Sequence, residues 1–464
     1  MIMTLNNFSN FKKIVNLSLA TFTVFFTGCN EKNNAQAQSS DKPNIIVILP
    51  DDLGWRDVGY HGSEIKTPNI DNLAKTGVKL EQHYVMATST PTRVCLMTGK
   101  YASRYGITSP DYGEVIDLGD PTLASVLQDN GYFTAIAGKW HMGSPPYTPL
   151  KYGFQSSYGY FDGQIDPYTH EYKTETELTD RQSWHRNDEY LDESSIHATD
   201  LITEEAIRII EEERGNPLFL YVAYSVPHTP LDEPNEWLSL YDELTIEPSR
   251  KLFAASVSHM DDGIGKIMDA LKRSGKHENT LVLFISDNGG QHSWQSNTEY
   301  RGKYANKPHL VLGNNYPLRG WKGDLYEGGI RVPAIANWPN YLKSGVADFP
   351  IHISDWLPTI CDLIGDQQSL KQSNIDGQNI WKPLTGIEPP LNDRSIYWKT
   401  NQTYAVRDNN WKLLVHRNDN KVELFNLEDD FRETKDLSEL NPEKTKFMLE
   451  LLEEFKKDDR PRRK

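Results

Sequence analysis

The feature that most constrains the fold is a set of continuous apolar runs of strand length, which recur along the chain with helical patterns between them. The first covers residues 44–49, and the others cover residues 133–137, 218–223, 281–285 and 332–338. A run without alternating polar residues is typical of a strand that is covered on both faces. The alternation of such strands with helices predicts an α/β fold with a large, mostly parallel sheet sandwiched by helices.

Boundary residues indicate where the helices between these runs begin and end. Pro68 stands at a first helical position and Gly77 follows the last turn, so a short helix is expected between them. Gly131 ends a second helix that begins at Leu123. Two longer helical patterns cover residues 199–213 and 250–273.

The pattern changes after Gly365. Residues 367–379 are polar, and four short apolar runs separated by turn residues follow, at 395–398, 404–406, 411–415 and 422–425. This predicts a small antiparallel sheet, closed by an amphipathic helix over residues 443–455. We therefore expect a large domain over residues 43–370 and a smaller α+β subdomain over residues 371–464.

The N-terminus has the pattern of a bacterial secretory signal. Lys12 and Lys13 precede an apolar stretch over residues 14–26 that is too short to span a bilayer. The residues that close it, Phe26-Thr27-Gly28-Cys29, resemble a lipobox, in which Cys29 is lipidated and becomes the mature N-terminus. The pattern predicts a signal peptide over residues 1–28, a flexible tether over 29–42, and a lipid-anchored protein in the periplasm or at the cell surface. A conventional signal peptide cut nearby is the alternative.

The charge balance limits the class of partner. The chain has 49 Lys and Arg against 65 Asp and Glu, a net charge of −16, and it has no long basic stripe, so a nucleic-acid partner is not expected. A chain this acidic that acts on an anionic substrate must gather its positive charge in one pocket. The three Cys residues are too few and too scattered for a disulfide framework or a zinc site.

Acidic pairs follow two of the predicted strands. Asp51 and Asp52 come after the first strand, and Asp287 and Asn288 come after the strand at 281–285. Ligands bind at the carboxyl edge of open α/β sheets, and four oxygen donors without His or Cys suit Ca²⁺ or Mg²⁺, with Ca²⁺ favoured. A solvated loop with a helix cap is the alternative for Asp51 and Asp52 alone.

The stretch from Ser89 to Lys100 resembles the signature of the formylglycine-dependent sulfatases, which is Cys or Ser, any residue, Pro, usually Ser, and Arg, followed by Leu, Thr and Gly. Further blocks of the family occur in its order, at residues 137–143, 227–230, 318–323 and 327–331. Within the family, residues 59–63, 66–69 and 167–170 are most similar to the arylsulfatase B type, which acts on sulfated amino sugars. The resemblance covers nearly everything from Asn44 to the C-terminus.

The resemblance makes residue 89 the nucleophile, after a maturase has oxidised its side chain to the aldehyde formylglycine. An ordinary serine that accepted a sulfonyl group would remain a stable sulfate ester, whereas a hydrated aldehyde carries a second hydroxyl whose deprotonation releases sulfate. Because residue 89 is Ser rather than Cys, the resemblance implies a bacterial maturase that accepts Ser as a transient partner.

The resemblance also assigns the other roles. Asp51, Asp52, Asp287 and Asn288, together with residue 89, would hold one Ca²⁺. Arg93 would fix the hydrate, while Lys139 and Lys322 would neutralise the sulfate oxygens. His141 would be the base and His228 the general acid, and His170 would contact a sulfated glycan substrate.

Three alternatives stay open at this point. The Ser89 hydroxyl can be a simple N-cap on a helix that begins near Pro91. The chain can be a phosphate or phosphonate ester hydrolase of the same superfamily, which would need a second metal site. It can also be a glycan-binding lipoprotein whose Ser89 is never matured.

Overall fold

The computed structural model describes residues 42–461, apart from 111–112, 173–180, 213, 296–307, 373 and 391–393. The expected signal peptide, the lipidation site Cys29 and the tether up to residue 41 lie outside the described residues. Residues Lys42–Lys464 form one compact unit. None of the described helices combines the length and the hydrophobicity that a bilayer crossing requires.

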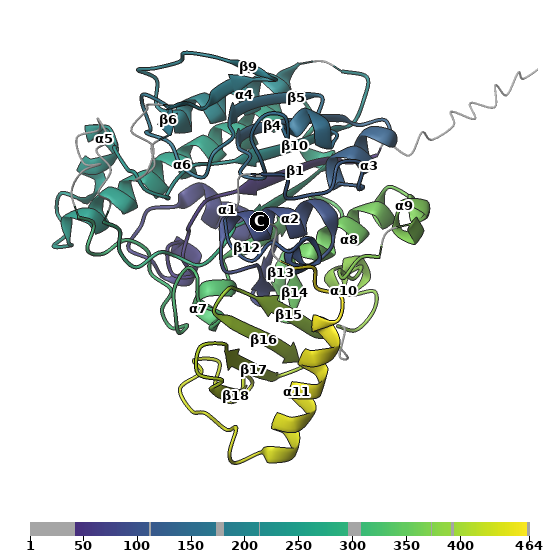
Figure 1. The fold of residues 1–464 in the computed structure, drawn as a ribbon. Coiled ribbons are helices and arrows are strands. Elements are labelled where there is room, and N and C mark those ends of the chain that lie inside the picture. The colour runs from purple at the N-terminus through teal and green to yellow at the C-terminus, as the bar shows by residue number, and fades with distance from the viewer. Residues whose placement is uncertain are drawn as a thin grey trace, which may run out of the picture. The chain divides into compact units, whose positions relative to one another are not determined.

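A ten-stranded mixed sheet forms the centre of this unit (Figure 1). The strands lie in the order β13 (Gly345–Ala347), β2 (Val78–Leu80), β12 (Ala334–Asn337), β11 (Thr280–Ile285), β1 (Asn44–Leu49), β10 (Leu218–Ala223), β4 (Phe133–Lys139), β5 (Ser156–Tyr160), β8 (Trp184–Arg186) and β9 (Glu189–Tyr190). The five central strands β11, β1, β10, β4 and β5 run parallel to one another. The predicted α/β fold with a mostly parallel sheet is therefore confirmed.

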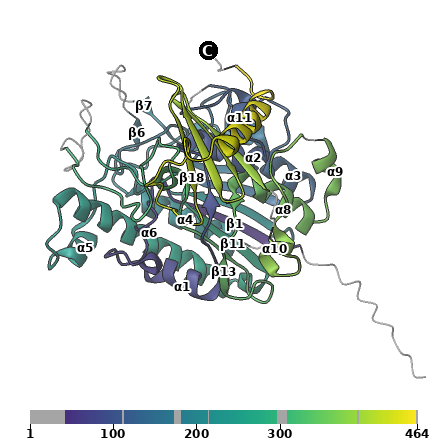
Figure 2. The same ribbon diagram turned by 90° about the horizontal axis from the view of Figure 1, so that it is seen from below.

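Helices cover both faces of this sheet, as the continuous apolar strands require. The residues of β1 alternate between two cores: Ile46 and Ile48 pack with α1 (Pro68–Thr76), α4 (Ala198–Glu211) and α6 (Pro248–Arg273). Val47 and Leu49 pack on the other face with α2 (Ser89–Thr98), α3 (Leu123–Asp129) and α8 (Trp356–Leu363). Figure 2 shows these two groups of helices on opposite sides of the sheet. Shorter helices are α5 (Asn235–Leu238), α7 (Glu327–Ile330), α9 (Gln367–Gln372) and α10 (Trp381–Thr385).

The segment between residues 144 and 192, which lacks a regular period in the sequence, contributes β5, β8 and β9 to the sheet edge. The hairpin of β6 (Glu171–Tyr172) and β7 (Arg181–Gln182) also lies here, and a separate pair joins β14 (Ile351–His352) to β3 (His83–Tyr84). Tyr158, Tyr160 and Trp184 are buried and their rings contact one another, so these three aromatic residues serve the packing of the segment itself.

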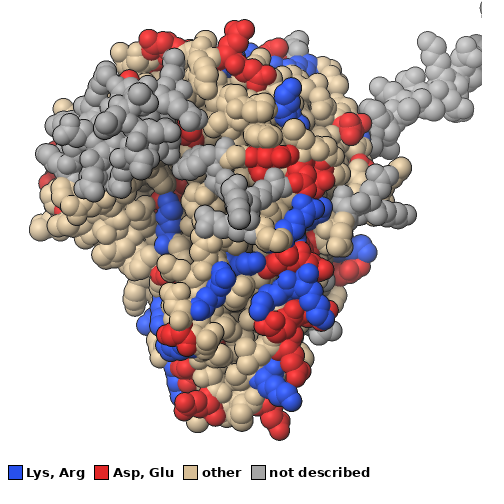
Figure 3. Space-filling view, viewed as in Figure 1, with Lys and Arg blue, Asp and Glu red and all other residues tan. Residues whose placement is uncertain are grey.

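The predicted C-terminal sheet consists of β15 (Ser395–Lys399), β16 (Thr403–Asp408), β17 (Trp411–His416) and β18 (Val422–Asn426), all antiparallel. Helix α11 (Pro442–Lys456) packs against it. On the face in Figure 3, Lys and Arg are interspersed with Asp and Glu over this region, and pairs such as Lys399 with Asp459 at 2.9 Å join them.

A buried charge cluster joins the C-terminal sheet to the large sheet. The Lys412 ammonium on β17 is fully buried, 2.9 Å from the Glu327 carboxylate and 2.8 Å from that of Glu433. The Glu327 backbone N–H donates to Glu433 at 2.7 Å, and Trp398 donates to the Val85 carbonyl at 2.9 Å. The C-terminal strands thereby fix the segment that begins α7, a short helix close in sequence to Lys322.

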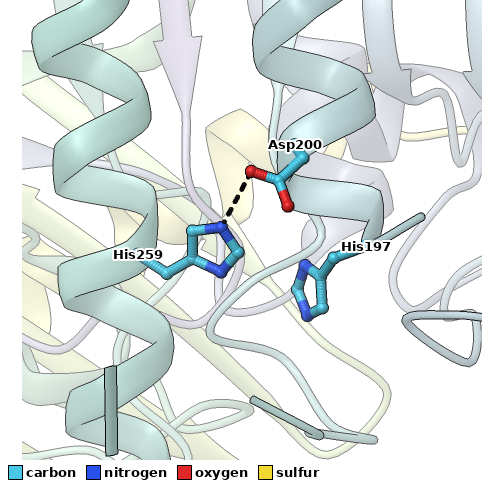
Figure 4. Close-up of side chains that lie close together, drawn as sticks. All are labelled: His197, Asp200 and His259. Carbon is cyan, nitrogen blue, oxygen red and sulfur yellow. Dashed lines mark hydrogen bonds and ion pairs between the residues drawn. The ribbon is translucent and has the colours of Figure 1, made fainter. Parts of the chain in front are cut away.

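A second buried cluster holds the loop that follows β10. His259 on α6 lies between two carboxylates, with Nδ1 2.9 Å from Glu233 on that loop and Nε2 3.1 Å from Asp200 on α4. His197 lies beside it, and Figure 4 shows His197 and Asp200 on one helical segment, facing His259 on another. His197 Nε2 donates to the Asp232 carbonyl at 3.0 Å.

The cluster has the ligand types of a metal site, since His197, Asp200 and His259 offer atoms within 4.8 Å of one another. A metal ligand needs a free lone pair on its imidazole nitrogen. His197 Nδ1 already accepts from the Thr199 backbone N–H at 3.1 Å, and both His259 nitrogens face carboxylates. The hydrogen bonds therefore define a protonated His259 between Glu233 and Asp200, which ties the loop to α4 and α6.

We predict that Lys412→Met lowers the free energy of unfolding by about 3–5 kcal/mol, because it leaves two buried carboxylates without their cation. Urea unfolding measures the change. Lys446→Met is the control, since its side chain is 80 % exposed and pairs with Glu450 at the surface, where the loss is about 0–1 kcal/mol. Equal losses in the two variants would contradict the structural role of Lys412.

We further predict a pH-dependent contribution from His259. Burial alone would lower its pKa, but Asp200 and Glu233 raise the pKa to about 9 from an ordinary 6.5. The stabilisation is therefore fully present below pH 6.5 and is lost as the pH rises through about 9. His259→Gln should be less stable than the wild type by about 3 kcal/mol at pH 6, and the two unfolding curves should converge near pH 10. The control Lys266→Gln removes an exposed cation two turns along α6 and should show no such convergence. A constant difference across this range would overturn the assignment of a protonated His259.

Candidate active site

The two acidic pairs meet at the carboxyl edge of the sheet, as predicted. β1 and β11 are adjacent and parallel, with Ile48 opposite Phe284, so the residues after both strands emerge together. The Asp52 backbone N–H donates to Asp287 at 3.1 Å, and the Asn288 side-chain amide donates to Asp52 at 2.7 Å. These four side chains, Asp51 included, are at most 1 % exposed. The alternative of a solvated loop is therefore wrong.

Ser89 faces this acidic edge. Helix α2 begins at Ser89 itself, and the N-cap residue is Thr88, whose side chain makes no capping bond. The Ser89 hydroxyl is buried and donates to Asp51 Oδ1 at 2.9 Å. The N-cap alternative for Ser89 is therefore wrong, because its hydroxyl points at a carboxylate and not at the N–H groups of the helix.

Arg93 lies one turn further along α2 and is completely buried. Its Nη2 donates to Asp287 at 3.0 Å, and its Nη1 donates to the Lys139 carbonyl and the Tyr221 hydroxyl, each at 3.0 Å. The guanidinium thus joins α2, β4, β10 and β11 at one point, and it compensates one of the buried carboxylates.

Two lysines supply the remaining positive charge. Lys139, the last residue of β4, bonds to the Asp51 carboxylate and to the Gly163 carbonyl. Burial lowers the pKa of its ammonium, although Asp51 opposes this effect. Lys322 lies 2.8 Å from the Asp52 carboxylate; burial opposes its charge, but Asp52 and Asp51 raise its pKa above the ordinary value.

The two histidines approach the same place from different loops. His141 follows β4 with a backbone φ of +52°, and its carbonyl accepts from Thr90 on α2 at 3.1 Å. His228 lies on the loop after β10, with Nε2 3.8 Å from Asp52. Burial lowers the pKa of both imidazoles, and the nearby lysines add to this effect.

The donors at this edge fit a divalent cation. Asp51, Asp52 and His228 offer ligand atoms within 4.8 Å of one another. The side-chain oxygen of Asn288, Oδ1, also indicates a cation here. It is buried and makes no hydrogen bond to any residue that the structure describes. An uncoordinated buried amide oxygen is costly, and a cation would satisfy it. The sequence analysis did not place His228 among the possible ligands.

His170 is not brought to this edge. Its ring is 1 % exposed and packs on Trp184 with centroids 4.5 Å apart, while Nε2 lies 3.1 Å from the Ile196 carbonyl. Burial lowers the pKa of this imidazole to about 4. Its expected contact with substrate stays a prediction.

Sequence reasoning missed the cluster of His197, Asp200, Glu233 and His259, which holds the His228 loop. The only local signal is the placement of His197 and Asp200 three residues apart at the start of a helix, where they share a face. Glu233 and His259 come from other parts of the chain, so no single motif contains the group.

Known proteins resemble this chain over most of its length. The sulfatase family model matches residues 43–366. Arylsulfatase J of Mus musculus is 35 % identical over 418 residues, which cover 83 % of this chain and 66 % of the mouse protein. The N-acetylgalactosamine-6-sulfatase of the same species is 29 % identical, over 85 % of this chain and 76 % of that protein.

A solved structure, that of Ps i-CgsB in complex with k-i-k-neocarrahexaose, superposes with a TM-score of 0.80. It is 33 % identical to this chain, and the match covers 91 % of this chain and 94 % of the other. The family model covers well over half of the sequence, and the buried carboxylates, the two lysines, the two histidines and Ser89 all lie within the matched residues. The chain therefore belongs to the sulfatase family of sulfuric ester hydrolases.

Proposed function

We propose that this protein hydrolyses sulfate esters of sulfated polysaccharides or oligosaccharides through residue 89, matured from Ser to formylglycine, with one bound Ca²⁺. The observation that carries the proposal is the position of the Ser89 hydroxyl, 2.9 Å from Asp51, in a carboxylate cluster that Arg93, Lys139, Lys322 and His228 contact. A sulfate ester is an anion, and this is the pocket of local positive charge that an acidic protein needs for it.

The chain's own residues provide charge and proton transfer. Lys139 contacts Asp51 and Lys322 contacts Asp52. Their two ammonium groups would neutralise the sulfate oxygens. His228 would protonate the leaving sugar oxygen, and the loop that carries it is fixed by Glu233. His141, held next to α2 by Thr90, would take the proton during release of sulfate.

Asp51, Asp52, Asp287, Asn288 and residue 89 would hold Ca²⁺, for which the unpartnered Asn288 oxygen is the main support. The ion supplies Lewis acidity to a sulfate oxygen and to the hydroxyl of residue 89. Formylglycine supplies the second hydroxyl that permits turnover. A maturase that accepts Ser would be the transient partner of this chain.

The choice of a glycan substrate comes from relatives. One is named for a sulfated amino sugar, N-acetylgalactosamine 6-sulfate, and one solved structure contains neocarrahexaose, an oligosaccharide. The lipobox-like residues before Cys29 support a lipid-anchored location in the periplasm or at the cell surface, where a bacterium meets such polymers. Metabolic labelling with a fatty acid, with Cys29→Ser as the control, tests the anchor.

A phosphate or phosphonate ester hydrolase is the second candidate. Such enzymes of this superfamily need a second metal site with further Asp and His ligands, and here the ammonium groups of Lys139 and Lys322 lie beside the carboxylates of the first site instead. The protein would bind glycans without hydrolysing them only if Ser89 were never matured, since the expected catalytic residues are all present.

We predict that sulfate release depends on maturation of residue 89. Protein co-expressed with a Ser-accepting maturase should have lost two hydrogens at Ser89 in peptide mass spectrometry and should release sulfate. Ser89→Ala should release none, whereas Ser89→Cys with a Cys-accepting maturase should regain activity. Full activity in Ser89→Ala would overturn the proposed mechanism.

We also predict that chelation inactivates the enzyme and that Ca²⁺ restores it. Asn288→Ala should weaken Ca²⁺ binding at least about 10-fold in calorimetry, because it removes the oxygen that has no other partner. The control Asp429→Ala changes an exposed carboxylate that bonds to Asn426 and should bind Ca²⁺ like the wild type. Stoichiometric zinc in purified active enzyme would count against calcium.

A further inference from the structure

Two arginine side chains lie against the ring of one exposed tyrosine, Tyr316. Tyr316 is 55 % exposed, and the guanidinium carbons of Arg56 and Arg432 lie 5.3 and 5.4 Å from its ring centroid. A guanidinium within about 6 Å of an aromatic ring is attracted by it. The three residues come from distant segments: the loop after β1, the block before Lys322, and the segment after β18.

Both arginines bring a positive charge to the same tyrosine ring. Among the residues that the structure describes, no carboxylate forms an ion pair with Arg56 or Arg432. Several other surface arginines do have an acidic partner, for example Arg273 with Glu211 at 2.7 Å, and Figure 3 shows basic and acidic residues interspersed on one face. Two like charges near one ring repel each other, and a bound anion would offset that repulsion.

This pair of arginines is connected to the active-site edge by short contacts. The Arg56 backbone N–H donates to the Asn314 carbonyl at 2.8 Å, and the Tyr316 N–H donates to the Asn314 side chain at 2.9 Å. Asn315, the next residue, accepts from the Gly290 N–H at 2.8 Å, and Gly290 is two residues from Asn288. Arg56 itself is four residues from Asp52. These contacts tie Arg56 and Tyr316 to the loops that carry Asp52 and Asn288, and Arg432 lies against the same tyrosine ring.

We propose that Arg56, Tyr316 and Arg432 form a subsite for a second sulfate group of the glycan, next to the sulfate ester that is hydrolysed. This inference rests on the proposed function. A guanidinium presents a planar fork of N–H donors that matches two oxygens of an oxyanion. The Tyr316 ring holds both forks in place before binding, so less side-chain freedom is lost when the sulfate arrives.

The affinity for oligosaccharides is measured in an inactive variant, so that an effect on binding is not confused with an effect on catalysis. In a Ser89→Ala background, calorimetry with carrageenan and chondroitin sulfate oligosaccharides compares one sulfate per molecule with two or more. Arg56→Gln and Arg432→Gln should each raise Kd for the multiply sulfated oligosaccharide about 3- to 10-fold, with a smaller effect on the singly sulfated one. The double variant should also show a weaker dependence of Kd on salt.

Arg417→Gln is the matched control. Its guanidinium lies 5.1 Å from the ring centroid of Tyr404 in the C-terminal sheet, and it bonds to the Thr400 and Asn401 carbonyls. This variant should bind every oligosaccharide as the parent does. A double variant of Arg56 and Arg432 that keeps the parent's Kd for multiply sulfated oligosaccharides would overturn the subsite.

Turnover by matured wild-type enzyme separates this result from a failure of the proposed function. Sulfate release from oligosaccharides, together with an unchanged Kd in the double variant, overturns the subsite alone. Wild-type enzyme that neither binds nor hydrolyses any of these oligosaccharides overturns the glycan substrate, and the subsite with it. A higher Kd confined to the two arginine variants supports the subsite.

Discussion

Compensation of buried carboxylates at one edge of the sheet is the constraint on which the rest of the structure depends. Asp51, Asp52 and Asp287 are removed from water, and burial of an unpaired carboxylate costs several kcal/mol. Arg93, Lys139 and Lys322 each contact one of them. These cations come from α2, from β4 and from the block that ends at α7, so the charges can be balanced only when these separate parts of the fold are in place.

The same arrangement makes the edge a site for an anion and a cation together. The carboxylates and the Asn288 oxygen suit a divalent cation, while the two ammonium groups suit sulfate oxygens. The Ser89 hydroxyl, at the first residue of helix α2, lies 2.9 Å from Asp51 in this group of charges. A nucleophile placed there reacts in a field that favours negative charge on the attacked group.

Two buried clusters of charged side chains support the segments that surround the site. His259, between Glu233 and Asp200, fixes the loop that carries His228, and Lys412 fixes the start of α7 through Glu327 and Glu433. Neither cluster touches the reacting atoms. Both hold segments that lead to the site, and the C-terminal sheet is connected to the site through the second of them.

The sequence by itself determined the elements and the candidate site residues, because both leave local patterns. The apolar runs predicted the central strands nearly to the residue, and Pro68 and Gly77 marked the ends of α1. Strand ends followed by Asp-Asp and Asp-Asn predicted the acidic edge. Only the tertiary structure showed that the segment over residues 144–192 extends the sheet, that the Ser89 hydroxyl faces Asp51, and that His170 is buried. It alone brought Glu233 to His259, and Arg432 to Tyr316 and Arg56. Such contacts join residues that are far apart in the chain. A local pattern of hydrophobicity or turn residues does not predict which distant side chain will lie beside a given charge.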